Sequence, residues 1–194
     1  FFFFYSWFEK FVHLSSNKNA KFVNKRVNIK EIEKKINFKI SDKQNFMEYS
    51  PLGLKYLKDI LSFIKRNNGG LLIIDYGYFN EKMQDTLQAI YNQKYSKVLE
   101  NIGNSDITYN INFYLIEKIA KNLKELHIDF TSQKKFLTNL GINQRAEIIS
   151  KNKTFSQKSD IFYRLKRLID KKQMGDLFKV MLIKKANNNF KIGF

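Results

Sequence analysis

The clearest pattern of apolar and polar positions lies in residues 50–78. Apolar side chains recur there at helical spacing and share one helical face: Leu54, Leu57, Ile60, Leu61 and Ile64. Ser50 can cap this helix, and Pro51 fits its first turn, where a missing N–H costs nothing. Residues 67–70 (Asn-Asn-Gly-Gly) favour a left-handed end. The pattern therefore predicts a capped helix that ends just before residue 71.

An apolar strand is expected next. Residues 71–74 are Leu-Leu-Ile-Ile, without polar alternation, which predicts a strand covered on both faces, as in a parallel sheet. Asp75, Tyr76, Gly77 and Tyr78 would follow at its carboxyl end, where open α/β sheets bind ligands. Helix and strand together make half of a βαβ unit, and the first half of that unit is not among these residues.

The rest of the chain is patterned less regularly. Two aromatic strands are expected around Tyr5 and Ser6 within residues 1–14, and another strand over residues 36–40. Helices are expected after Asn112, after Thr131 or Ser132, and over residues 86–91, 144–149 and 160–169, with strands over residues 126–130 and 178–183. A few strands followed by helix–strand alternation indicate an α/β fold.

Composition excludes several classes of protein. The chain has 194 residues and no Cys, so disulfides and thiolate metal sites are excluded and an intracellular location fits. It opens on four Phe residues with no basic region before them and no cleavage site after them, which argues against a signal peptide and suggests a fragment. No segment is long enough to span a membrane, so no membrane partner is expected.

The net charge of +17 raises the question of nucleic-acid binding. Lys greatly outnumbers Arg, although Arg is the better residue for phosphate because its guanidinium binds in a bidentate manner. The lysines are scattered, and Asn, Ile and Phe are also abundant, as in proteins from AT-rich genomes. We therefore expect a solvated basic surface and no specific nucleic-acid partner, with RNA binding as the weakest hypothesis.

Six short motifs occur in a fixed order. They are DYGY at 75–78, TLQA at 86–89, GNSDIT at 103–108, NF at 112–113, TSQKKFLTNLGI at 131–142 and MGDLFKV at 174–180. In this order the chain resembles the MidA family of class I S-adenosyl-L-methionine (SAM)-dependent methyltransferases, which is related to the mitochondrial complex I assembly factor that methylates arginine. Trp7, Glu9 and Val12 also fit the segment that follows the Asn-Glu-Phe-Phe-Asp-Ala motif in this family.

The resemblance implies the C-terminal half of a Rossmann-like class I methyltransferase sheet, with an N-terminal β-hairpin region. The strands at 71–75, 178–183 and 126–130 would be neighbours. Residues 1–45 would form a β-rich insertion, 46–186 the half-sheet and 187–194 a tail, together a single partial domain. The family's Glu-x-Gly-x-Gly loop, which holds SAM, is absent, so no cofactor-binding residue is expected here.

The substrate-pocket candidates are Asp75, Tyr76, Gly77, Tyr78, Asp106 and Thr108. Each also has a structural alternative: a turn cap for the two Asp residues and Thr108, packing for the tyrosines, and a backbone requirement for Gly77. Gln133 and Arg145 are expected in capping and surface roles. His13 and His127 lack a second ligand at metal spacing, so no metal site is expected. Catalytic residues stay unassigned.

The resemblance also leaves the activity open. Gln93 and Asn110 stand where the family commonly has His, which removes two imidazoles that could move a proton. We expect a fragment of a SAM-dependent protein arginine methyltransferase, inactive alone, in the cytoplasm of a bacterium or the mitochondrial matrix of a eukaryote. Its partner would be the missing N-terminal half or a protein substrate. The alternative is a non-catalytic remnant or binding module that needs a partner half.

Overall fold

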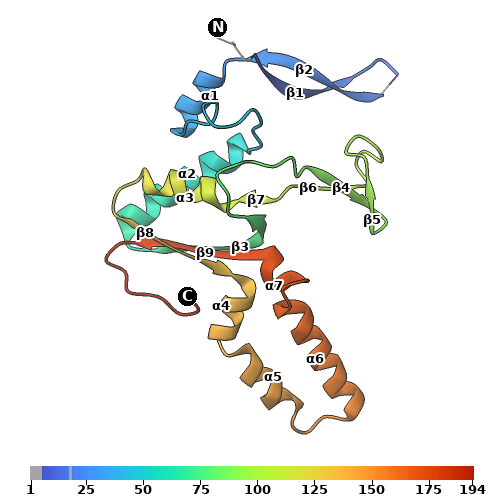
Figure 1. Cartoon of the computed structure of the whole chain (residues 1–194), viewed down its shortest axis with the longest axis vertical. Coiled ribbons are helices and arrows are strands. Elements are labelled where there is room, and N and C mark those ends of the chain that lie inside the picture. The colour runs from blue at the N-terminus through green and yellow to red at the C-terminus, as the bar shows by residue number, and fades with distance from the viewer. Residues whose placement is uncertain (1–5, 18) are drawn as a thin grey trace. The chain divides into compact units, whose positions relative to one another are not determined.

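The structure of this chain is a computed structural model that describes residues 6–17 and 19–194 (Figure 1). It divides into two compact units. The first comprises Phe1–Glu48 and Lys82–Tyr109, and the second comprises Tyr49–Glu81 and Asn110–Phe194.

The first unit begins with a hairpin. Strands β1 (Trp7–Leu14) and β2 (Ala20–Val27) pair antiparallel, from Trp7 opposite Val27 to Leu14 opposite Ala20. Of the two strands predicted around Tyr5 and Ser6, the second is confirmed as β1, and the first lies outside the described residues. Tyr5 and the four residues before it lie outside the described residues.

Helix α1 (Ile29–Ile36) occupies part of the segment predicted as a strand over residues 36–40. That prediction is wrong because Asn37 adopts a left-handed conformation (φ 55°), which ends the helix and turns the chain back. One carboxylate oxygen of Glu33 then accepts hydrogen bonds from the N–H groups of Ile40 (2.6 Å) and Ser41 (2.7 Å) and from the Ser41 hydroxyl (2.8 Å). Burial acts to raise the pKa of Glu33, but these bonds and the charge of Lys39 outweigh it, so the pKa is lowered.

A small sheet completes the first unit. Strands β4 (Gln88–Tyr91), β5 (Lys94–Ser96) and β6 (Asp106–Thr108) are ordered β5-β4-β6, all antiparallel. The helix predicted over residues 86–91 is therefore wrong. Asn92 and Gln93 both have positive φ (48° and 61°), as a two-residue hairpin turn requires, and this turn pairs β4 with β5.

The second unit is built on a four-stranded sheet in the order β7-β3-β9-β8. Strand β3 (Gly70–Tyr78) pairs antiparallel with β9 (Phe178–Lys185), which pairs antiparallel with β8 (Leu126–Ser132). Strand β7 (Ile111–Asn112) joins β3 in parallel, only at Gly77 and Tyr78. The predicted neighbourhood of the three main strands is confirmed.

Helices lie on both sides of this sheet (Figure 1). Helices α2 (Pro51–Asn67) and α3 (Phe113–Lys121) lie on one side, and α4 (Gln133–Asn139) lies on the other. Beyond α4 follow α5 (Ile142–Ser150), α6 (Phe155–Ile169) and α7 (Met174–Leu177). The predicted ends of α2 are confirmed, because Ser50 Oγ accepts from the N–H of Gly53 (3.0 Å) and Asn68 is left-handed.

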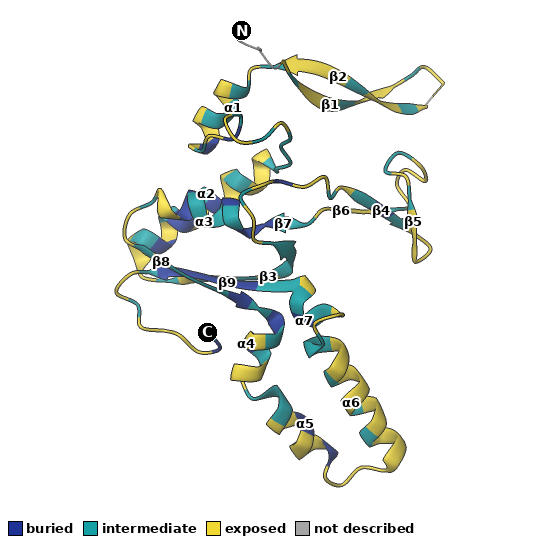
Figure 2. Cartoon of the chain, in the orientation of Figure 1, coloured by how far each residue is buried: buried dark blue, intermediate teal, exposed yellow. Residues whose placement is uncertain are grey.

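The core of the second unit centres on β9, which is almost entirely buried (Figure 2). The prediction that residues 71–74 are covered on both faces is wrong, because Leu72 and Ile74 are each 47% exposed. Helices α2 and α3 contact one face, whereas α4, on the other, contacts β8 and β9 and does not cover Leu72 and Ile74. Ile60, predicted on the buried face of α2, is also exposed.

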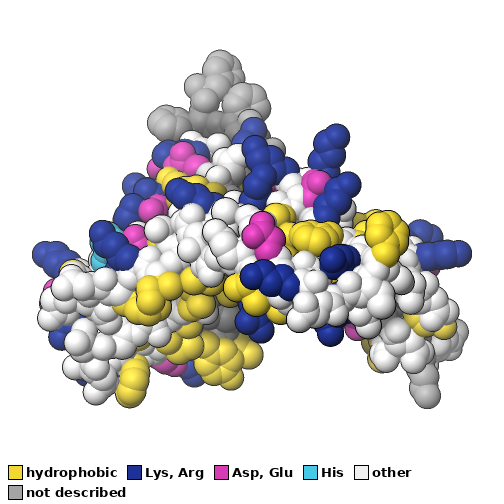
Figure 3. All heavy atoms as spheres, turned by 90° about the horizontal axis from the view of Figure 1, so that it is seen from below, with side chains coloured by type: hydrophobic (Ala, Val, Ile, Leu, Met, Phe, Trp, Pro, Cys, Tyr) yellow, Lys and Arg dark blue, Asp and Glu magenta, His cyan; other side chains and the backbone are white. Residues whose placement is uncertain are grey.

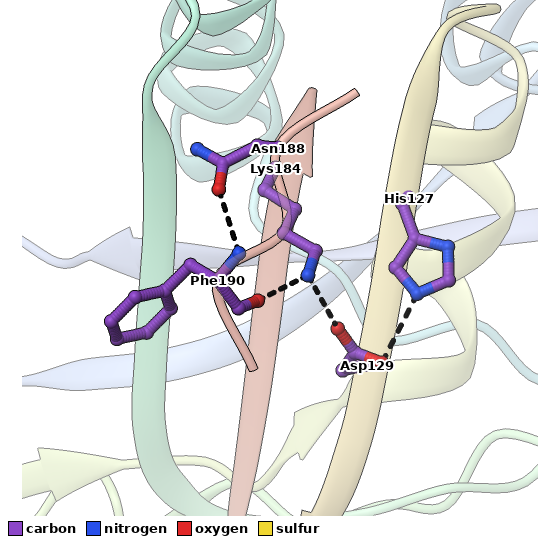
Figure 4. A network of polar contacts seen from close by, with 5 residues as sticks. All are labelled: His127, Asp129, Lys184, Asn188 and Phe190. Atoms are coloured by element: carbon purple, nitrogen blue, oxygen red, sulfur yellow. Dashed lines mark hydrogen bonds and ion pairs between the residues drawn. The ribbon is translucent and has the colours of Figure 1, made fainter. Parts of the chain in front are cut away.

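The C-terminal residues return to this sheet (Figure 4). Lys184 is 1% exposed; its Nζ lies 3.4 Å from Asp129 Oδ2 and donates a hydrogen bond to the carbonyl oxygen of Phe190. His127 Nε2 lies 3.1 Å from the other Asp129 oxygen. A buried charge pair therefore joins strands β8 and β9 to the tail.

Candidate functional site

Four of the predicted pocket residues are the last four residues of β3. Asp75 is half-buried, and its Oδ1 accepts a hydrogen bond from the N–H of Tyr76 (2.8 Å). Lys179 stands opposite Asp75 on β9, but its ammonium donates to the carbonyl oxygen of Asp176. The Tyr76 ring packs edge-on against Phe178, with centroids 5.7 Å apart. Asp75 thus stands at the carboxyl end of a central strand, where a guanidinium could meet its carboxylate.

Gly77 has a backbone role. A Cβ at this position would lie 2.2 Å from the carbonyl oxygen of Ile111 and 2.9 Å from a ring carbon of Phe113. No side chain fits there, so glycine allows β7 to approach β3 and pair with it. The structural alternative for Gly77 is the one that the geometry supports.

Asn112 is a site residue that the sequence indicated only as a helix cap. It pairs with Tyr78 across β3 and β7, and its Oδ1 accepts from the N–H of Leu115 (3.2 Å) at the start of α3. The side chain is buried, and among the described residues its Nδ2 has no hydrogen-bond partner. A buried amide without a partner is costly, so this donor is a candidate contact for a ligand or another chain segment.

An aromatic cluster follows directly after the end of β3. The ring of Phe79 lies 4.5 Å from that of Phe130 and 5.7 Å from that of Tyr114, and Phe113 lies 5.6 Å from Phe130. Phe113 is fully buried. In the sequence, the NF motif and Phe79, which directly follows the DYGY motif, are the features that could have indicated this cluster. The cluster gives the carboxyl end of β3 an apolar wall.

Asp106 and Thr108 belong to the other unit, on strand β6 rather than in the turn that was their structural alternative. Asp106 is exposed, whereas the Thr108 hydroxyl accepts a hydrogen bond from Gln88 Nε2 (3.3 Å). Two motifs separated by some twenty residues are therefore adjacent, TLQA on β4 and DIT on β6. Thr86 of the first motif also donates to Glu48 through its N–H and hydroxyl.

The remaining candidates have structural positions. Gln93 lies in the β4–β5 turn, Arg145 is exposed on α5, and buried Gln133 donates through Nε2 to the carbonyl oxygen of Leu168 (2.9 Å). His127, expected to stand alone, has the carboxylate partner Asp129. Within residues 6–17 and 19–194, no group of three His, Asp or Glu could hold a metal ion.

The fold identifies the class of protein. Strand β9 runs antiparallel between β3 and β8, with helices on both faces, which is the C-terminal part of a Rossmann-like methyltransferase sheet. The chain belongs to the MidA-like family described as "Putative S-adenosyl-L-methionine-dependent methyltransferase", whose sequence model matches residues 5–131. The resemblance given by the six motifs is confirmed.

Relatives and solved structures agree with this assignment. The chain is 27% identical over 123 residues to protein arginine methyltransferase NDUFAF7 of Danio rerio (63% of this chain, 29% of the relative). It is 31% identical over 119 residues to the Drosophila melanogaster homolog (61% and 27%). A Burkholderia thailandensis methyl transferase candidate solved with S-adenosyl-homocysteine has a TM-score of 0.76 at 19% identity, over 97% of this chain and 50% of that one.

The lengths differ markedly. The chain spans less than a third of these curated relatives and about half of the solved chain. Among the described residues, no helix combines the length and apolar character needed to cross a membrane.

Proposed function

We propose that this chain forms the substrate-side half of a SAM-dependent protein arginine methyltransferase of the complex I assembly type. Methyl transfer would then need a second segment that supplies the SAM-binding half. The observation that carries this proposal is the incomplete edge of β3, which stands beside the candidate site. The names of the curated relatives support arginine as the substrate, and their mitochondrial location supports the matrix in a eukaryote, with the cytoplasm expected in a bacterium.

The edge of β3 fits the role of a docking strand. Opposite β9, residues 70–76 pair with no other described strand, whereas Gly77 and Tyr78 pair with β7. Leu72 and Ile74 expose one apolar face beside this edge. Unpaired N–H and C=O groups next to apolar side chains favour the addition of a strand from another segment.

Helix α2 offers a second apolar surface in the same unit. Its exposed side chains recur at intervals of four, four and three residues along one face: Leu52, Tyr56, Ile60 and Phe63. These four side chains are 42–59% exposed. They share one helical face, whereas the apolar side chains on most protein surfaces are scattered singly. A segment that extends the sheet past β3 would find apolar cover here.

The chemistry assigns a role to Asp75. A guanidinium nitrogen would attack the methyl carbon of SAM, the carbon–sulfur bond would break, S-adenosyl-homocysteine would leave, and the nitrogen would give up a proton to water. SAM supplies the electrophilic methyl group when it is bound. Asp75 would orient the guanidinium through charge-assisted hydrogen bonds, and the Asn112 amide would donate to a group bound beside it.

Reconstitution tests the proposal. The segment encoded upstream of Phe1 is co-expressed with this chain, and transfer of labelled methyl from SAM is measured into a peptide with Arg and into the same peptide with Lys. We expect transfer into the Arg peptide only from the two segments together. Asp75→Asn should lower transfer roughly tenfold to a hundredfold without separating the segments. The matched control Asp42→Asn changes an exposed Asp in the first unit, away from β3 and α2 in the sequence, and should leave transfer unchanged.

The outcomes separate the hypotheses. A complex that binds SAM but transfers no methyl group would contradict the proposed methyltransferase activity and favour the non-catalytic binding module. Transfer into the Lys peptide but not the Arg peptide would contradict arginine as the substrate. Full activity of the Asp75→Asn variant would remove the role given to that carboxylate.

A further inference from the structure

Helices α4 to α7 carry a concentration of positive charge. Residues 133–177 contain eleven Lys or Arg but only four Asp or Glu. This region lies beyond residues 5–131, to which the family model matches. The match to the family model therefore gives no account of this charge.

Helix α6 is also poorly covered. None of its fifteen residues is buried, and Phe162 is 43% exposed (Figure 2). Its half-buried side chains on the inner face include Leu165 and Ile169. Figure 3, which views the molecule from the α5–α6 end, shows hydrophobic side chains at the surface with Lys and Arg close around them.

Two hollows lie beside α4, α6 and α7, and Lys134 lines both. The first, of about 310 Å³, has Phe162, Leu165 and Ile169 as its apolar lining, with Lys134, Lys166 and Asp170 as its charged groups. The second, of about 400 Å³, adds Lys135, Lys171 and Asp176. Because the hollows share Lys134, we treat them as one surface, the α4–α6 groove, whose apolar lining lies in the first hollow and whose charged lining is mostly Lys.

The walls of the α4–α6 groove are fixed in place. Gln133 at the start of α4 donates to the carbonyl oxygen of Leu168 near the end of α6. Between α6 and α7 the chain turns so tightly that a Cβ on Gly175 would lie 2.4 Å from the carbonyl oxygen of Ile169. A groove with such walls is pre-organised, so a partner would not have to order it on binding.

We propose that the α4–α6 groove binds an acidic amphipathic helix of a partner protein. Leu-like side chains on one face of that helix would cover Phe162, Leu165 and Ile169, and flanking carboxylates would pair with Lys134 and Lys171. RNA fits less well, because neither hollow is lined by an Arg, the residue best suited to bind phosphate in a bidentate manner.

Fluorescence anisotropy tests the groove directly, without SAM or methyl transfer. The full chain is titrated into a fluorescein-labelled helical peptide with Leu on one face and Glu on the other, and into a scrambled peptide of the same composition. The groove variant Lys134→Glu/Lys171→Glu and the separate variant Phe162→Ala should each weaken binding roughly tenfold. The matched control Lys151→Glu/Lys153→Glu makes the same charge change in the exposed loop after α5 and should weaken it by less than about threefold.

Three outcomes would overturn the proposal. Equal binding of the scrambled peptide would show that composition, not an amphipathic face, is recognised. Equal loss in the control variant would show diffuse attraction to a basic surface. Tighter binding of an oligouridine, lost in the groove variant, would make the groove an RNA site. Circular dichroism of every variant confirms that the helices still form, so a misfolded variant is not read as a loss of the site.

Discussion

Gly77 and the carbonyl oxygen of Ile111 approach so closely that a Cβ on Gly77 would lie 2.2 Å from that oxygen. This contact places β7 beside β3, and β7 in turn places Asn112 opposite Tyr78. The same approach brings the ring of Phe113 to the end of β3. The absence of a side chain at one position therefore determines where a strand, a helix start and a buried amide meet.

Gly77→Ala should destabilise the second unit by about 2 kcal/mol, because the added methyl group must displace backbone rather than a flexible side chain. Urea denaturation measures the free energy of unfolding. Gly69→Ala is the matched control: its Cβ would meet only Ile64, at an ordinary 3.8 Å, and it should change stability by less than about 0.5 kcal/mol. Similar stability of the two variants would show that β7 does not need this close approach.

The elements that the sequence predicted best have signals of their own at both ends. Helix α2 has Ser50 and Pro51 at its start and Asn68 at its end, so its bounds follow from local chemistry. The strand predicted over residues 36–40 and the helix predicted over residues 86–91 are wrong because left-handed Asn37, Asn92 and Gln93 decide the direction of the chain there. An Asn or Gln with positive φ is hard to read from sequence, since most adopt negative φ.

In the candidate site, too, the sequence predicted the features that depend on local patterns and missed those that depend on distant contacts. The position of Asp75 at the end of a strand followed from an apolar run, which is a local pattern. The exposure of Leu72 and Ile74 did not, because it depends on which helices reach that face of the sheet. The buried amide of Asn112 depends on the contact between Gly77 and Ile111, two residues far apart in the sequence.

Glu33 should make the first unit sensitive to acid. Burial would raise its pKa, but the bonds from Ser41 and Ile40 lower it in the folded state. A lowered folded pKa means that the stabilisation is complete above the unfolded value of roughly 4.3 and is lost as pH falls through the folded value. Hydrogen exchange of the Ile40 and Ser41 amides, measured from neutral pH downward, should show protection falling in that window beyond the intrinsic change in exchange rate.

Glu33→Gln is the matched test of charge, since its Oε1 can keep all three hydrogen bonds. It should cost about 1 kcal/mol at neutral pH and remove the acid dependence. Acid dependence that persists in this variant would assign the effect to another group.

Lys184 and Asp129 should behave as a coupled pair. Lys184→Met would remove the ammonium beside the Asp129 carboxylate, which would keep His127 as its partner among the described residues. It would cost roughly 2 kcal/mol, with loss of the contact to Phe190. The double variant Lys184→Met/Asp129→Asn should cost less than the sum of the two single changes. Strictly additive free energies of unfolding would show that the two charges do not support each other.

The isolated chain should not bind SAM measurably, because it lacks the Gly-rich turn that lets a backbone approach the cofactor. Calorimetry at millimolar SAM is the measurement. A saturable heat that fits one site would show that the described part of the fold, including Asp75 and Asn112, is enough to hold the cofactor, and would contradict the need for a second segment.

The open edge of β3 should make the isolated chain self-associate despite its high net charge. On the side away from β9, residues 70–76 pair with no other strand in the described part of the chain. Leu72 and Ile74 are exposed beside this edge, and such an edge pairs readily with another copy. Sedimentation velocity should show oligomers for the chain alone and a defined complex after co-expression with the matching N-terminal half. Leu72→Thr/Ile74→Thr places residues of high strand propensity at both positions but removes the apolar face, and should reduce the oligomers. Ile148→Thr/Ile149→Thr, which changes two exposed residues of α5, should not. A monodisperse, cooperatively folding chain without any partner would mean that β3 needs no further strand, and the proposal that it is a docking edge would then fail.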